Sequence, residues 1–282
     1  MATTSGAILA GQRRRKRVRA ALLSLAVLYV AVLLLAPLVG IAYVALRPGL
    51  GIFSETFSDP RVQHAFLLTG IITICTLFVT TLFGVVVAWT LSRDDFRGKK
   101  LMNALVDLPF AVSPVTVGVM VVLLFGPAGW FESWVNAAGI QVLFALPSMV
   151  LVTIFISIPF VVRGVVPVLQ ELGQDEEEAA HTLGASPLQS FFKVTLPNIK
   201  WGLAYGVALT TSRALGEVGA VLIVSGAIQN QTETATTFVL FALEERLDSQ
   251  AYLVALTLAA VSVVLLTGIE IAKHRGTREE AR

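Results

Sequence analysis

Arg213 and Glu217 lie four residues apart inside an otherwise apolar stretch, residues 201–224. Residues four apart share one face of a helix, so we expect the guanidinium and the carboxylate to bond each other. A charge at the centre of a bilayer costs roughly 2.5–3.5 kcal/mol on insertion scales, so both groups must face the protein interior or water. Two interpretations stay open. Either Arg213 helps to form an anion path or gate, or the pair is structural and fixes the helix register or the contact with a second subunit.

Ser113 and Thr116 place hydroxyl groups beside Pro109 and Pro114, which interrupt another apolar run. Proline frees backbone groups, which is tolerated in a membrane only where protein or water satisfies them. Neutral hydroxyl donors suit a dehydrated oxyanion, because tight binding by fixed charge slows its release. These hydroxyls are therefore candidates for a substrate path, and helix packing is the alternative. Asp107, near the start of the same run, is expected to cap its helix.

Residue patterns of enzymes are absent from the sequence. It has no phosphate-binding G-x-x-x-x-G-K-[ST] loop and no evident Ser/His/Asp or paired-carboxylate set. One cysteine and three scattered histidines exclude a disulfide framework within the chain and argue against a metal cluster. We therefore expect no catalytic residue, no metal site and no cofactor bound by this chain, and no nucleic-acid partner.

The elements that carry these residues are membrane spans. Hydrophobic residues make up 55% of the 282 residues and charged residues 14%, against about 25% charged in soluble domains. A bilayer core about 30 Å thick needs about 20 apolar residues per helix. Six runs are long enough, which predicts an all-α membrane protein with six transmembrane helices. The runs are residues 20–46, 65–91, 104–125, 142–162, 201–224 and 251–272.

Basic residues predict the orientation of these spans. Lys and Arg crowd cytoplasmic loops, and placing the N-terminus inside puts 17 of them inside and 3 outside. We therefore expect both termini to be cytoplasmic, in the plasma or inner membrane. The expected segments are a basic tail (1–19), a first transmembrane helix with its external loop (20–61), a transmembrane domain (62–272) and a cytoplasmic tail (273–282). The basic tail serves topogenesis or, alternatively, binds anionic membrane lipid.

The cytoplasmic loop 163–200 is expected to form a helical hairpin. Four acidic residues from Asp175 favour the start of a helix, and Gly184 is suited to end it in a left-handed conformation. Ser186 and Gln189 then fit a capping box, with Pro187 between them. Pro197 is expected to close this second helix. The hairpin either docks a partner or packs on its own bundle.

The same loop carries a resemblance to a known family. Its Glu-Ala-Ala at 178–180, Gly184 and the Val-Thr-Leu-Pro run at 194–197 resemble the EAA loop of ABC importer permeases, with Val194 where isoleucine is usual. In that family the loop docks into a groove on a cytoplasmic ATPase and transmits its motion. The resemblance thus implies ATPase-coupling roles for Glu178, Ala179, Ala180, Gly184, Leu196 and Pro197.

Three further segments, 108–114, 149–166 and 195–228, are similar to the CysW-type permeases of sulfate and thiosulfate importers. This similarity implies the type I ABC importer (MetI-like) fold and ATP-driven import of sulfate and thiosulfate. The implied partners are a homologous CysT-type permease, an extracytoplasmic sulfate-binding protein and an ATPase dimer that holds ATP and Mg. Molybdate or tungstate permeases of the same family remain an alternative. An ion-gradient-driven secondary transporter is a further alternative. Such a protein needs carboxylates inside the membrane as ion relays, and Glu217 is the one that lies deep in a span.

Overall fold

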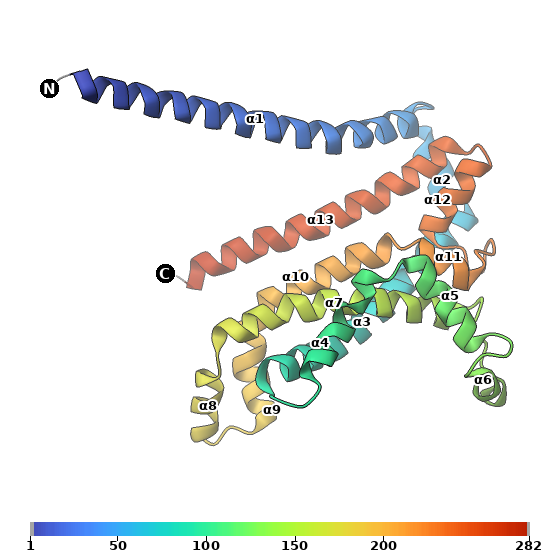
Figure 1. The fold of residues 1–282 in the computed structure, drawn as a ribbon. Helices are drawn as coiled ribbons and strands as arrows, with labels where there is room; N and C mark the ends of the chain where they lie inside the picture. The colour runs from blue at the N-terminus through green and yellow to red at the C-terminus, as the bar shows by residue number, and fades with distance from the viewer. Residues whose placement is uncertain (1–2, 281–282) are drawn as a thin grey trace.

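The computed structural model describes residues 3–280, and this part of the chain is helical without strands (Figure 1). Four helices contain stretches long and apolar enough to cross a membrane: α1 (Thr3–Leu46), α3 (Pro60–Arg93), α7 (Leu146–Leu172) and α13 (Asp248–Glu280). Two bent helix pairs raise the number to six if each pair is one span. The expected all-α class is therefore confirmed.

Two of the expected single spans are broken. The third consists of α4 (Lys99–Ala111) and α5 (Pro114–Phe125), which meet at 110°. The fifth consists of α10 (Leu196–Leu215) and α11 (Gly219–Ser225), which meet at 54°. Extended backbone at Val112 and Ser113, directly before Pro114, produces the first break.

Helices α3, α7 and α10 form the centre of the bundle through close backbone contact. A Cβ atom on Gly206 of α10 would lie 2.9 Å from Val161 Cα of α7, and one on Gly202 would lie 2.6 Å from the Gly164 oxygen. Gly84 of α3 approaches Val161 from the other side. The glycines at 202 and 206 therefore form a close-packing face, as their spacing predicts.

Helix α1 diverges from the bundle and from α13, and the two meet only toward their 46 and 248 ends (Figure 1). There Ala45 of α1 and Leu253 of α13 pack with Ile52 of the short helix α2 (Gly51–Ser58). Most of the apolar side chains along Ala21–Leu46 are exposed in the single chain. In the backbone, helix α1 includes the basic segment 13–17.

The α2 end of the bundle also carries α6 (Glu132–Ala138) and α12 (Ala235–Glu244). Arg61, expected in a loop, lies in the first turn of α3 and binds two carboxylates that flank α12. Its Nε lies 2.8 Å from Glu233 Oε2, and its Nη1 lies 2.8 Å from Glu245 Oε2. Glu233 is fully buried, and the Arg61 guanidinium holds the pKa of Glu245 below its usual value. This network ties both ends of α12 to the start of α3.

Candidate functional site: a helical hairpin and two broken helices

The predicted hairpin is present at the other end of the bundle, as α8 (Asp175–Thr182) and α9 (Pro187–Ser190). Gly184 has φ +87°, and its N–H donates to the His181 oxygen while the Ala185 N–H donates to the Ala180 oxygen. These two bonds form the Schellman motif that ends helices at glycine. The capping box at Ser186 and Gln189 is also formed, with both bonds present. Local sequence signals therefore define this hairpin.

The helical backbone of the second helix does not end at Pro197 as expected. A π-helical turn, η1 (Phe191–Thr195), joins α9 directly to α10, and the Leu196 N–H donates to the Phe191 oxygen five residues back. Proline lacks only a donor that the first turn of α10 does not need, so the helix passes through it. At the other side, Arg163 lies inside α7, and the connecting segment begins at Gly173 rather than at residue 163.

The hairpin exposes three large apolar side chains in the single chain. Leu183 is 88% exposed, Leu188 72% and Phe192 60%. No residue of α8 is buried, and a Cβ atom on Gly184 would meet nothing within 4 Å. Neighbouring exposed apolar side chains of this kind mark a contact surface for a partner. The geometry therefore favours docking over packing of these side chains on the chain's own bundle.

The inner face of the hairpin is tied to the bundle by Arg93 at the end of α3. The Arg93 guanidinium donates to both carboxylate oxygens of Glu177, at 2.9 and 3.1 Å, and to the Leu169 oxygen of α7 at 2.8 Å. Thr195 of η1 donates to the same Glu177 carboxylate at 2.9 Å. Sequence reasoning missed this connection, because Arg93 and Glu177 are 84 residues apart. Four helical segments therefore meet at one ion pair.

The two helix breaks lie side by side in the bundle. A Cβ atom on Gly219, at the start of α11, would lie 3.2 Å from Val115 Cγ2 and 3.4 Å from Pro114 Cβ, at the start of α5. Both interrupted helices therefore bring freed backbone groups to one region. Broken helices of this kind are found where transporters place their substrate sites.

The predicted pair of Arg213 and Glu217 occupies this region. Arg213 Nη1 lies 2.6 Å from Glu217 Oε2, and Glu217 Oε1 accepts the Ala220 N–H at 2.8 Å. Glu217 is buried, whereas the Arg213 side chain is 28% exposed. The carboxylate thus compensates the arginine and also caps α11.

Ser113 and Thr116 lie at the neighbouring break, at the start of α5. Both residues are exposed, and neither hydroxyl makes a hydrogen bond within the described part of the chain. The structure therefore places all four candidate path residues at the two breaks. Asp107 differs from its expected role: it lies inside α4, where it pairs with Arg163 instead of capping the helix.

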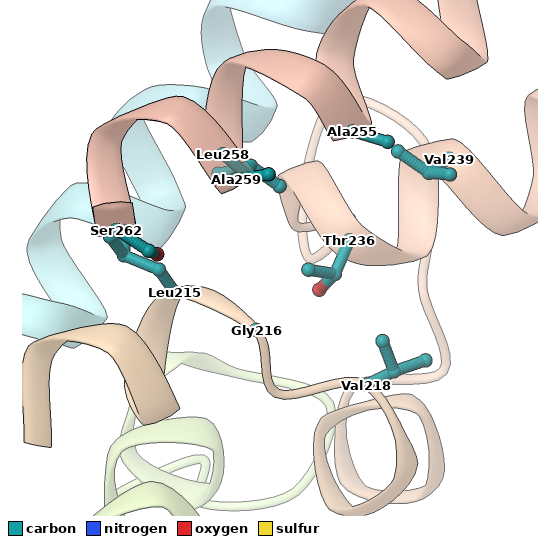
Figure 2. Close-up of a pocket in the computed structure, with 9 residues that line it drawn as sticks. All are labelled: Leu215, Gly216, Val218, Thr236, Val239, Ala255, Leu258, Ala259 and Ser262. Carbon is teal, nitrogen blue, oxygen red and sulfur yellow. The ribbon is translucent and has the colours of Figure 1, made fainter. Parts of the chain in front are cut away.

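A pocket of about 270 Å³ adjoins the second break, between α10, α12 and α13 (Figure 2). Gly216 and Val218 form one side, and Thr236 and Ser262 contribute hydroxyls to otherwise apolar walls. Thr236 already donates to the Glu217 backbone oxygen at 2.7 Å. No charged side chain lines the pocket. Its chemistry therefore fits an apolar group better than an oxyanion.

Comparison with known proteins gives the family. The model of the binding-protein-dependent transport system inner membrane component matches residues 80–272. The chain belongs to this family. It is 43% identical over 265 residues to the sulfate transport system permease protein CysW of Synechocystis sp., covering 94% of this chain and 96% of that protein. It is 36% identical over 253 residues to the CysT permease of Escherichia coli strain K12, covering 90% and 91%.

Solved structures give the same fold. A chain of a bacterial alginate ABC transporter, crystallised with its alginate-bound periplasmic protein, superposes with a TM-score of 0.76. The match covers 94% of this chain and 96% of that chain at 18% sequence identity, so it concerns the fold alone. The resemblance of the sequence to ABC importer permeases is thus confirmed at the level of family and fold.

Proposed function

We propose that this chain is the permease subunit of an ATP-driven importer that moves sulfate, and also thiosulfate, into the cytoplasm. The observation that carries the proposal is the 43% identity to a curated sulfate permease over nearly the whole of both chains. The two helix breaks, with Arg213 beside the second of them, supply a region in which such a path can run. This chain then binds no cofactor itself.

The exposed hairpin is the proposed docking site of a cytoplasmic ATPase dimer, which holds ATP and Mg. Ala179 and Gly184 are small, so the ATPase can approach the hairpin backbone closely there. The exposed side chains nearby are those of Leu183, Leu188 and Phe192. Glu178 is exposed on α8, and Leu196 and Pro197 begin α10 directly after η1. ATP and substrate must favour different states of the complex for such docking to drive transport.

The remaining partners are a homologous CysT-type permease and an extracytoplasmic sulfate-binding protein. The hairpin end then faces the cytoplasm, and the α2, α6 and α12 end receives the binding protein. Both termini are cytoplasmic in this arrangement, as the distribution of Lys and Arg predicts. The complex lies in the plasma or inner membrane.

The decisive experiment is uptake of radiolabelled sulfate by proteoliposomes that contain the complete complex. We expect uptake to require ATP, the ATPase and the binding protein, and to be competed by unlabelled sulfate and thiosulfate. Stronger competition by molybdate or tungstate would assign those anions instead. Uptake by this chain alone, driven by an ion gradient, would replace the importer by a secondary transporter.

A further inference from the structure

A second pocket, of about 420 Å³, lies between the end of α3, the start of α4 and α7. Its volume falls within the range of about 300–1,000 Å³ that is typical of small-molecule sites. It opens at the same end of the bundle as the hairpin, because its α3 wall is Leu91, two residues before Arg93. The proposed coupling does not use it, and neither do the helix breaks.

Five polar side chains line this pocket, and all of them can donate hydrogen bonds: Lys99, Lys100, Asn103, Arg163 and Gln170. Arg163 is held in place, because its Nε donates to Asp107 Oδ1 at 2.8 Å and its Nη2 donates to Asn103 Oδ1 at 2.9 Å. Its Nη1 takes no part in these bonds. Since the Asn103 oxygen accepts from Arg163, the amide nitrogen remains available as a donor.

The charge of the pocket is positive. Asp107 compensates Arg163, and Asp95 lies 3.0 Å from Lys99, although Asp95 itself is almost fully exposed. Lys100 has no acidic partner among the described residues. One uncompensated positive charge among several hydrogen-bond donors favours a group with several acceptor oxygens and negative charge, such as a phosphate.

Apolar side chains continue from these cations along the pocket side of α4. Phe110 lies two helical turns after Asn103 on the same face, is 57% exposed, and its ring packs edge-on against Phe160 of α7 with the ring centroids 5.5 Å apart. An exposed aromatic pair next to a cluster of Lys and Arg matches the boundary between acyl chains and headgroups. Basic pockets at the cytoplasmic ends of membrane helices bind lipid headgroups.

We propose that this pocket binds the phosphate of an anionic membrane lipid whose acyl chains lie along α4. The proposal rests on the cytoplasmic placement of the hairpin end given under the proposed function. Lys99, Lys100 and Arg163 bind the phosphate oxygens, and the amides of Asn103 and Gln170 orient it. Because α4 and α7 both line the pocket, the lipid fixes the first half of the broken span against the bundle.

The test is the affinity of the purified complete complex for fluorescent phosphatidylglycerol, measured in micelles of neutral detergent. Each lysine near an anionic lipid is worth about fivefold in affinity, so Lys99→Gln/Lys100→Gln should weaken binding about 25-fold. The charge-conserving Lys99→Arg/Lys100→Arg should bind as the parent does. Lys193→Gln is the matched control, because Lys193 is an exposed lysine of η1 outside the pocket. This variant should bind phosphatidylglycerol with the affinity of the parent.

Two competition arms identify the source of the phosphate. Unlabelled phosphatidylglycerol should displace the probe, while phosphatidylcholine, inorganic phosphate and sulfate should not. Displacement by inorganic phosphate or sulfate would overturn the lipid assignment in favour of a free oxyanion. Equal affinity in the glutamine variant and the parent would show that the pocket binds no anionic lipid. Sulfate uptake is measured after the same purified complexes are reconstituted into proteoliposomes, so lipid binding without uptake would refute the proposed function and not this site.

Discussion

Replacing Arg93 by methionine tests whether the hairpin of α8 and α9 is held by one ion pair. Methionine retains most of the side-chain volume beside Trp89 but removes the charge and every donor. Three hydrogen bonds from the guanidinium are lost, two to Glu177 and one to the Leu169 oxygen. Glu177 then keeps a single side-chain bond, from Thr195.

The expected magnitude follows from burial. The side chains of Arg93 and Glu177 are 8% and 13% exposed, and breaking a fully buried pair costs about 3–5 kcal/mol. Because α8 borders water and Glu177 can turn outward, we expect a lower value, about 2 kcal/mol, for opening of the hairpin. A free energy of about 2 kcal/mol corresponds to about thirtyfold faster amide exchange.

Hydrogen exchange of residues 173–195 in the purified complex measures this effect. Arg97→Met is the matched control, because Arg97 is exposed and lies in the neighbouring turn. The double variant Arg93→Met/Glu177→Gln should recover part of the protection, since it leaves no uncompensated carboxylate. Sulfate transported per ATP hydrolysed should fall with Arg93→Met. Unchanged exchange in the hairpin of this variant would refute the argument that Arg93 holds it.

Three further predictions concern the hairpin, the bundle and the helix breaks. Gly184→Asp should leave the permease in the membrane but release the ATPase on purification, whereas Gly139→Asp, also at an exposed glycine with positive φ, should not; retention of the ATPase would refute the docking surface. Gly206→Leu should destabilise the complex by about 1–3 kcal/mol, seen as a lower midpoint of thermal unfolding, because α7 backbone lies 2.9 Å from its Cβ position. Arg213→Met and Glu217→Gln should each reduce the amount of assembled complex, and the double variant should restore part of it. Restored assembly with uptake would make the pair structural, restored assembly without uptake would place Arg213 in the anion path, and intact single variants would contradict the buried pair.

The hairpin could be predicted from sequence because short-range bonds define it. Gly184 and Ser186 determine their own turn and cap within a few residues, and the Arg213–Glu217 pair follows from helix periodicity. The apolar runs likewise predicted where the membrane helices lie. The prediction that the third and fifth spans are continuous helices was wrong. Apolar composition does not distinguish one straight span from two short helices that meet at an angle.

Long-range pairs account for most of what was missed. Arg93 binds Glu177, Arg61 binds Glu233, and Asp107 binds Arg163. Each partner is 56 to 172 residues distant, so no local pattern connects them. The distribution of basic residues among the loops predicts the topology but not the partners of these arginines. In the structure, each of the three forms an ion pair with a residue of another segment.

The continuity of the chain beyond the hairpin suggests how docking can act on the helix breaks. Because η1 replaces the expected stop at Pro197, α9, η1 and α10 form one helical path from residue 187 to Leu215, which ends beside Arg213 and Glu217. An α-helix extends 1.5 Å along its axis per residue, so α10 alone is about 30 Å long. Gly202 and Gly206 of α10 lie directly against the α7 backbone. This close contact favours sliding or tilting of the whole helix over local bending. A displacement of the hairpin would therefore reach the break at Gly216, which the Arg213–Glu217 pair bridges.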